Sequence, residues 1–197
     1  MIRKIFLSLS ILLSLFMLTG CTLMDNFSKK LGYSKVFTEI VIQAEPEEVW
    51  AVITDSSNYK NWNPVIVNAV GDYAKDAKIV NTVVEKGKKP TKIKSKVVKF
   101  EPPFHLNQFG GYRGIITFDH HYILEKVEEG TKVIQKEEYT GFYVNFWDSS
   151  WVEPAYNQVN EALKKEVLRR KFDATGHYSR PDVFNLTIDK SKKKPIS

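Results

Sequence analysis

Alternating apolar and polar positions dominate the middle of the chain and predict β-strands. Six such runs lie between residues 65 and 140, and one more precedes them. Glycine and proline residues separate the runs, which is typical of short strands joined by turns. The predicted strands are 38–43, 65–70, 78–86, 92–101, 105–110, 115–127 and 131–140. Together they indicate an antiparallel meander.

The strand predicted at 92–101 contains a break in its alternation. The lysines at its start point toward one face, but the apolar residues that follow are shifted by one position. Such a slip predicts a β-bulge near Val97 or Val98.

Two short helices should follow the first strand. Pro46 suits the first position of a helix, and the two acidic residues after it suit the positive end of the helix dipole. This helix should end near Asp55. A second helical turn at 58–62 should end before the next proline, because the residue preceding a proline disfavours helical geometry.

Apolar residues recur at helical spacing from Val152 to Val167 and predict a long amphipathic helix. The apolar stripe includes Tyr156, Val159 and Leu163, and it is about 22 Å long at about 1.5 Å per residue. Such a stripe must be covered, and the predicted sheet offers the necessary face. We therefore expect an α+β fold in which this helix packs on the sheet.

Strand alternation also assigns side chains of the last two strands to the interior. On the first of them the more apolar face should point inward, and on the second the face without lysines should do so. These inward residues are Phe118, His120, Tyr122, Gln135, Glu137 and Tyr139. Buried polar groups are costly unless they find partners. A mostly apolar interior with a few polar groups is typical of a small-molecule site, although the same residues could form a filled core.

The first residues have the pattern of a secretion signal. Two basic residues precede an apolar stretch at 5–17, which is shorter than the about 20 residues that a membrane-spanning helix needs. The stretch ends at Leu18-Thr19-Gly20-Cys21, which resembles the bacterial lipobox. That resemblance implies cleavage before Cys21, acylation of Cys21 and attachment to a membrane through the acyl chains. An uncleaved anchor and a buried free thiol are the alternatives.

We expect four regions along the chain. A lipoprotein signal peptide covers 1–20, and the lipidated N-terminus with a polar tether covers 21–35. One domain covers 36–172, and a basic, partly disordered tail covers 173–197. The lipid should hold the domain in the cell envelope, facing the periplasm or the exterior. The residue after the cysteine is not the aspartate of an inner-membrane retention signal, which favours the outer membrane in a Gram-negative cell.

Charge and cysteine content restrict the possible partners. The chain has 29 Lys and Arg residues against 23 Asp and Glu residues, and its net charge is +6. Much of the surplus lies near the C-terminus, where it fits a solvated helix face and a loose tail. The sequence holds no nucleic-acid-binding motif, so no nucleic acid partner is expected. Cys21 is the only cysteine, which excludes a disulfide within the chain.

A set of short motifs lies along the predicted domain. Ala44-Glu45-Pro46-Glu47-Glu48-Val49-Trp50 ends the first strand, and Trp62-Asn63-Pro64 follows it. Further on come Phe100-Glu101-Pro102-Pro103, Gly130-Thr131 and Tyr139-Thr140-Gly141. The set resembles the polyketide cyclase/START-like superfamily, also called SRPBCC. This implies a helix-grip fold, in which a curved antiparallel sheet wraps around the long C-terminal helix and encloses an apolar cavity.

The resemblance implies that the cavity binds a small hydrophobic or lipid-like ligand without transforming it. The residues expected to line the site are Trp62, Phe118, His120, Tyr122, Gln135, Glu137, Tyr139, Tyr156, Val159 and Leu163. One alternative is a cyclase- or dehydratase-like enzyme that uses His120 and Glu137 as an acid–base pair. Another is a cell-envelope interaction module with a filled core.

Metal binding and cofactors are not expected. Asp119 and His121 share one face of a strand, but a third ligand would have to come from a remote position such as His105 or His177. The glycines match no phosphate-binding pattern and fit turns instead.

Overall fold

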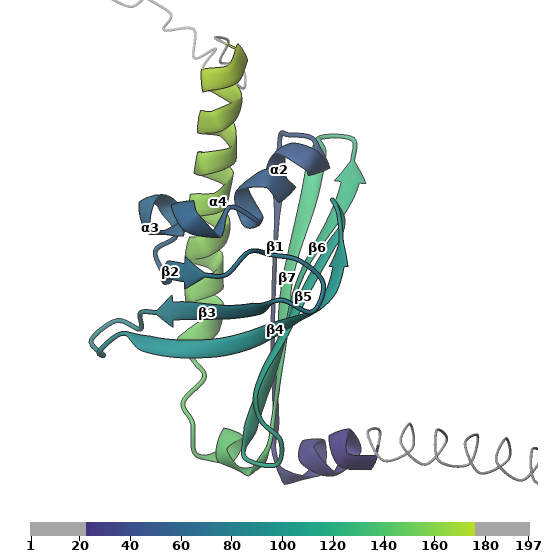
Figure 1. Cartoon of the computed structure of the whole chain (residues 1–197), viewed down its shortest axis with the longest axis vertical. Helices are drawn as coiled ribbons and strands as arrows, with labels where there is room; N and C mark the ends of the chain where they lie inside the picture. The colour runs from purple at the N-terminus through teal and green to yellow at the C-terminus, as the bar shows by residue number, and fades with distance from the viewer. Residues whose placement is uncertain (1–22, 176–197) are drawn as a thin grey trace, which may run out of the picture.

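The computed structural model describes residues 23–175, which form one curved sheet, one long helix and several short helices (Figure 1). In chain order the elements are β1 (Tyr33–Ile42), α2 (Pro46–Ile53), η1 (Ser56–Asn58), α3 (Tyr59–Trp62), β2 (Ile66–Val70), β3 (Lys78–Val83), β4 (Thr91–Glu101), β5 (His105–Tyr112), β6 (Ile116–Val127), β7 (Gly130–Thr140), η2 (Phe142–Asn145) and α4 (Val152–Thr175). The seven strands of this part pair antiparallel in the order β1-β7-β6-β5-β4-β3-β2. The predicted antiparallel meander and the α+β helix-grip fold are confirmed.

α4 packs on the curved sheet through the stripe predicted from the sequence. Val152, Val159, Leu163 and Val167 are each at most 2% exposed. Leu163 and Val167 join the main core with residues of β1, β6, β7 and α2, whereas Val159 packs with Val65 in a separate cluster. In Figure 1, β1, β5, β6 and β7 run roughly along α4, and β2, β3 and β4 turn across it. The sheet therefore surrounds the helix from two directions.

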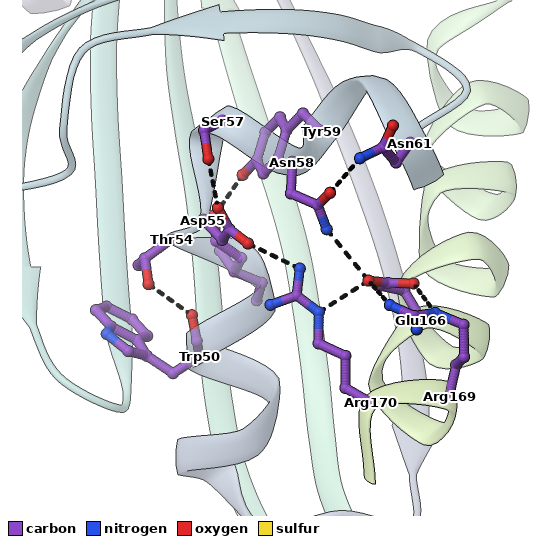
Figure 2. A network of polar contacts seen from close by, with 11 residues as sticks. Trp50, Thr54, Asp55, Ser57, Asn58, Tyr59, Asn61, Glu166, Arg169 and Arg170 are labelled. Carbon is purple, nitrogen blue, oxygen red and sulfur yellow. Dashed lines mark hydrogen bonds and ion pairs between the residues drawn. The ribbon is translucent and has the colours of Figure 1, made fainter. Parts of the chain in front are cut away.

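A polar cluster fixes α4 to the segment that follows α2 (Figure 2). Glu166, on α4, is buried and accepts hydrogen bonds from Arg169, Arg170 and Asn58. Arg170 also donates to Asp55 Oδ2 at 2.8 Å. The hydrogen bonds from the two arginines lower the pKa of Glu166 to about 2. The cluster therefore stays ionised at neutral pH and holds the far end of α4 in place.

Two further predictions of local structure can be compared directly. The pairing of β4 with β5 changes register between Val97 and Lys99, which confirms the predicted bulge. The long helix continues to Thr175, beyond its predicted last apolar residue. An ion pair of 2.6 Å between Arg169 and Asp173, one turn apart, stabilises this extension. The first residues assigned to the tail are therefore helical.

The polar tether predicted for 21–35 is wrong for the part that the structure describes. Residues 23–31 form a helix, and β1 begins at Tyr33. Ser28 is 4% exposed, and its hydroxyl lies 3.1 Å from Thr140 Oγ1 on β7. The segment is polar in composition, but its contacts with the sheet give it a fixed position, which composition alone does not reveal.

Several predictions fall on residues outside the described range. The signal peptide, Cys21, His177 and the basic end of the tail all lie within 1–22 or 176–197. Among residues 23–175, no helix is both long and apolar enough to cross a membrane.

Candidate functional site

A cavity of about 760 Å³ lies between the curved sheet and α4. This volume is within the range of small-molecule sites, about 300–1,000 Å³. Eight of the ten residues predicted for the site line the cavity: Phe118, His120, Tyr122, Gln135, Glu137, Tyr139, Tyr156 and Val159. The interior is therefore hollow, and the alternative of a filled core does not describe this fold.

Trp62 and Leu163, the other two predicted site residues, do not line the cavity. Leu163 is fully buried in the main core. Trp62 packs edge-to-face on Tyr59, with ring centroids 5.2 Å apart, and contacts the cluster around Val65. Leu163 points inward, as the helical stripe predicted, but neither residue is among those that line the cavity.

Glu137 is the principal ionisable group of the cavity wall. It is 5% exposed, and its Oε2 accepts hydrogen bonds from the hydroxyls of Tyr139 and Tyr156. Burial raises the pKa of Glu137 to about 7, although the two tyrosines act in the opposite direction. At neutral pH this carboxyl group is therefore divided between its neutral and charged forms.

His120 begins a chain of buried hydrogen bonds that crosses from the sheet to α4. Its Nε2 lies 3.3 Å from Gln135 Oε1, Gln135 Nε2 donates to Asn160 Oδ1 at 3.1 Å, and Asn160 Nδ2 donates to Thr38 Oγ1 at 3.0 Å. Burial lowers the pKa of His120 to about 4. The imidazole is therefore neutral at physiological pH.

The predicted acid–base pairing of His120 with Glu137 is only partly realised. The two residues are direct cross-strand neighbours on β6 and β7, as the sequence predicted. However, His120 is hydrogen-bonded to Gln135, and Glu137 is hydrogen-bonded to the two tyrosines. Adjacency in the sheet therefore did not determine which polar groups bond to each other.

Some buried polar side-chain atoms lack a protein partner, and two of them belong to the cavity wall. Within residues 23–175, four such side-chain atoms occur: Trp62 Nε1, Asn63 Nδ2, Asn81 Oδ1 and Trp151 Nε1. Asn81 and Trp151 line the cavity. One acceptor and one donor are thus left for a bound molecule or water to satisfy. Asn81 lies on the inward face of β3, where the alternation of that strand would have indicated it.

Exposed lysines of the β3–β4 hairpin form part of the cavity rim. Lys88, Lys89, Lys92 and Lys94 are exposed and belong to the lining. Tyr112, at the end of β5, lies on the rim as well and is 76% exposed. The opening of the cavity is therefore bordered by lysines, of which Lys88 is paired with Glu85 at 2.6 Å, and by an exposed aromatic ring.

The possible metal ligands lie on the other face of the sheet. His121 Nδ1 is 2.9 Å from His105 Nε2, and His121 Nε2 is 3.3 Å from Asp119 Oδ1. Burial lowers the pKa of His105. In the described part of the chain, no group of three His, Cys, Asp or Glu residues is arranged to hold a metal ion.

Solved structures of other proteins share this fold. The Zhui aromatase/cyclase from Streptomyces sp. R1128 has 14% identity and a TM-score of 0.63, over 74% of this chain and 100% of that one. A protein from Thermus thermophilus has 15% identity and a TM-score of 0.59, over 70% and 99%. A protein of unknown function from Staphylococcus aureus has 11% identity and a TM-score of 0.58, over 72% and 97%. Identities this low show the fold alone.

One curated protein matches over a short stretch. Nitrilase 3 from Arabidopsis thaliana is 58% identical over 34 residues, which are 16% of this chain and 10% of that protein. The chain thus spans about a tenth of the length of the curated relative it matches, and we transfer no activity from it.

The family match covers nearly the complete sheet and most of α4. Residues 34–168 match the family described as polyketide cyclase / dehydrase and lipid transport. These residues include every strand of the described sheet except the first residue of β1, and all the residues that line the cavity. The chain therefore belongs to the polyketide cyclase/dehydrase and lipid transport family.

Proposed function

We propose that the protein binds a small hydrophobic or lipid-like molecule in the cavity and releases it unchanged. The observation that carries this proposal is an apolar and aromatic cavity of about 760 Å³ that contains a few converging polar groups. Such a composition favours binding of an apolar body and orientation of one polar substituent.

The polar substituent should contact Glu137 and the two tyrosines. A carboxyl group with a pKa of about 7 can accept or donate a hydrogen bond near neutral pH. It is therefore suited to a hydroxyl or carbonyl group on the ligand. Asn81 Oδ1 and Trp151 Nε1 offer a second acceptor and a second donor, so a ligand with two separated polar groups fits best.

The state of His120 supports binding without catalysis. Its pKa of about 4 makes it a weak base, and its ring nitrogen is directed at Gln135 within a buried chain of hydrogen bonds. A general base works best when its pKa is near the working pH. In our proposal His120 therefore shapes the wall and does not move protons.

A cyclase- or dehydratase-like enzyme is the second candidate. The pKa of Glu137, about 7, is well placed for general acid–base catalysis, and Tyr139 and Tyr156 adjoin its carboxyl group. In this version Glu137 would exchange protons with the ligand and His120 would position the ring system.

We further propose that the protein is a lipoprotein of the cell envelope. The support is Leu18-Thr19-Gly20-Cys21 together with the basic and apolar residues before it. Growth of the producing cells with an alkyne-tagged fatty acid should label the protein, and Cys21→Ser should abolish the label. A label that persists in the variant would exclude acylation at Cys21.

Ligand binding can be tested with a matched pair of variants on β3. Val83 lines the cavity, whereas Val80 lies on the opposite face of the same strand. Native mass spectrometry of the protein purified from its own cells should reveal a bound small molecule at stoichiometric amounts. Val83→Phe should reduce its occupancy by filling the cavity, and Val80→Phe should not. Equal occupancy in both variants, or a ligand-free wild type, would refute cavity binding.

The two candidates differ in what happens to the bound molecule. The released compound is incubated with the wild type and with Glu137→Gln, and its mass and chromatographic retention are followed. Binding without catalysis predicts an unchanged compound in both samples. Conversion by the wild type alone would establish the enzyme and assign the proton transfer to Glu137.

A further inference from the structure

Large apolar side chains are exposed together at one end of the molecule. They come from the helix of residues 23–31, from the β5–β6 turn and from η2 with the residue after it. The principal members are Leu23, Phe27, Tyr112, Ile115, Tyr143 and Phe146, which are 68%, 61%, 76%, 49%, 47% and 76% exposed. We call this group the end surface. Exposed apolar patches of this kind mark sites of interaction with proteins or membranes.

The end surface is a single unit because its segments are hydrogen-bonded to one another. Tyr143 N donates to Ile115 O at 3.0 Å, which joins η2 to the β5–β6 turn. Asn145 Nδ2 donates to Leu31 O at 2.6 Å, which joins η2 to the end of the helix. In Figure 1 the helix 23–31 and η2 lie together at the end of the sheet opposite α2.

We propose that the end surface rests on a lipid bilayer. The main reason is its position in the chain, because Leu23 follows Cys21 and the apolar stretch 5–17 almost directly. If that stretch is retained, it brings Leu23 to the membrane. If it is removed and Cys21 is acylated, the acyl chains bring Leu23 to the same place. The inference thus rests on the proposed membrane attachment, but not on how the attachment is made.

The side chains of the end surface suit the boundary between lipid and water. Tyrosine and phenylalanine are favoured there, because their rings accept the acyl region while a tyrosine hydroxyl stays hydrated. Two charged groups of these segments are paired with each other: Arg113 Nη1 lies 3.4 Å from Asp25 Oδ1. Placing this surface on lipid therefore brings Arg113 and Asp25 to the membrane as a pair and not as two separate charges.

This orientation brings one part of the cavity rim, Tyr112, toward the lipid. Tyr112 belongs both to the end surface and to the cavity rim. A ligand could pass between the membrane and the cavity with little exposure to water.

The proposal can be tested by the depth of single fluorescent probes in the full chain. An environment-sensitive fluorescent amino acid is incorporated in place of Phe146, Tyr112 or Phe104. Phe104 is the matched control, because it is an exposed aromatic residue directly before the other end of β5, about 26 Å from Tyr112 along a strand of about 3.3 Å per residue. Each protein is reconstituted into phosphatidylethanolamine–phosphatidylglycerol vesicles with or without nitroxide groups on the acyl chains.

Docking predicts a clear difference between the probes. Emission from positions 146 and 112 should shift to shorter wavelength and should be quenched by the nitroxide lipids, whereas emission from position 104 should change in neither way. Unquenched probes at 146 and 112 on protein that floats with the vesicles would overturn the docking and leave the attachment intact. Protein that does not float would refute both.

A second copy of the chain is the competing occupant. It predicts that the probe at position 146 is blue-shifted in detergent without lipid, in a manner that depends on protein concentration, and is not quenched by nitroxide lipids. That result would also overturn the proposal. Ligand occupancy is measured separately as above, and Phe146 does not line the cavity. The probe at position 146 therefore distinguishes failure of docking from failure of ligand binding.

Discussion

Glu137 and His120 should give the folded protein two pH dependences of opposite sign that almost cancel. The pKa of Glu137 rises on folding from its ordinary value of 4.5 to about 7. The pKa of His120 falls from 6.5 to about 4. Both changes have burial as their largest cause, and the two residues are cross-strand neighbours on the cavity wall.

The sign of each contribution follows from which state binds the proton more tightly. The contribution of Glu137 to stability is complete below pH 4.5 and is lost as the pH rises to about 7, because the unfolded chain releases this proton first. The contribution of His120 is complete above pH 6.5 and is lost as the pH falls to about 4, because the unfolded chain binds this proton first. Each displacement corresponds to about 3 kcal/mol.

Each single variant should therefore show a pH dependence of stability that nearly cancels in the wild type. Glu137→Gln keeps an acceptor for the tyrosines, and His120→Gln keeps a donor for Gln135. The free energy of unfolding is measured by urea titration, followed by tryptophan fluorescence, at several pH values between 4 and 8. The free energy of unfolding of Glu137→Gln, minus that of the wild type, should rise by about 3 kcal/mol between pH 4.5 and 7. The free energy of unfolding of His120→Gln, minus that of the wild type, should fall by about 3 kcal/mol between pH 4 and 6.5.

The double variant and a surface control make the test decisive. With both groups removed, the difference from the wild type should again be nearly independent of pH. Glu138→Gln, on the solvent face of the same strand, controls for the loss of a carboxylate from β7. If the curve of Glu137→Gln runs parallel to the wild type over the whole range, the carboxyl group does not titrate near neutral pH in the folded state.

Three further predictions concern stability and the shape of the cavity, and each is checked by urea unfolding. Glu166→Gln should lower the free energy of unfolding by about 1–2 kcal/mol, because it removes the carboxylate that Arg169 and Arg170 share, although each arginine keeps a second acidic partner. Asp173→Asn, at the exposed end of α4, should have a much smaller effect. Gly110→Ala should lower the free energy of unfolding by about 1–3 kcal/mol, because the new Cβ would overlap the ring of Phe118. Since Phe118 lines the cavity, ligand occupancy should fall as well. Tyr59→Phe should lower the free energy of unfolding by about 1–3 kcal/mol, because it removes the hydroxyl that donates at 2.5 Å to the carbonyl oxygen of Ile53, at the end of α2.

The fold could be predicted from the sequence because its main signals are periodic and local. The alternation of β6 and β7 correctly placed Phe118, Tyr122 and Gln135 on the inner face. The shifted alternation after Val97 correctly indicated a bulge. Such patterns record which face of an element is buried, and burial of one face largely determines how a sheet and an amphipathic helix can pack.

The contacts within the site could not be predicted in the same way. Periodicity correctly turned Leu163 inward, but whether an inward side chain meets open space or another side chain depends on its neighbours in three dimensions. The partners of His120 and Glu137 depend in turn on side-chain rotamers and on Asn160 and Tyr156, which come from a distant helix. The helix of residues 23–31 was missed because its contacts with β7 are separated by more than one hundred positions in sequence.

Whether the interior is hollow or filled is a more difficult question than which residues face it. The cavity volume is the small difference between the space that the curved sheet and α4 enclose and the volume of the side chains inside it. A slight change in curvature alters that difference greatly, and hydrophobic periodicity contains no measure of curvature. Glu137 is the more informative position, because a core selected only for packing gains nothing from a carboxyl group whose burial raises its pKa to about 7. The polar residues on an inward face, more than the apolar ones, were therefore the sequence feature that indicated a site.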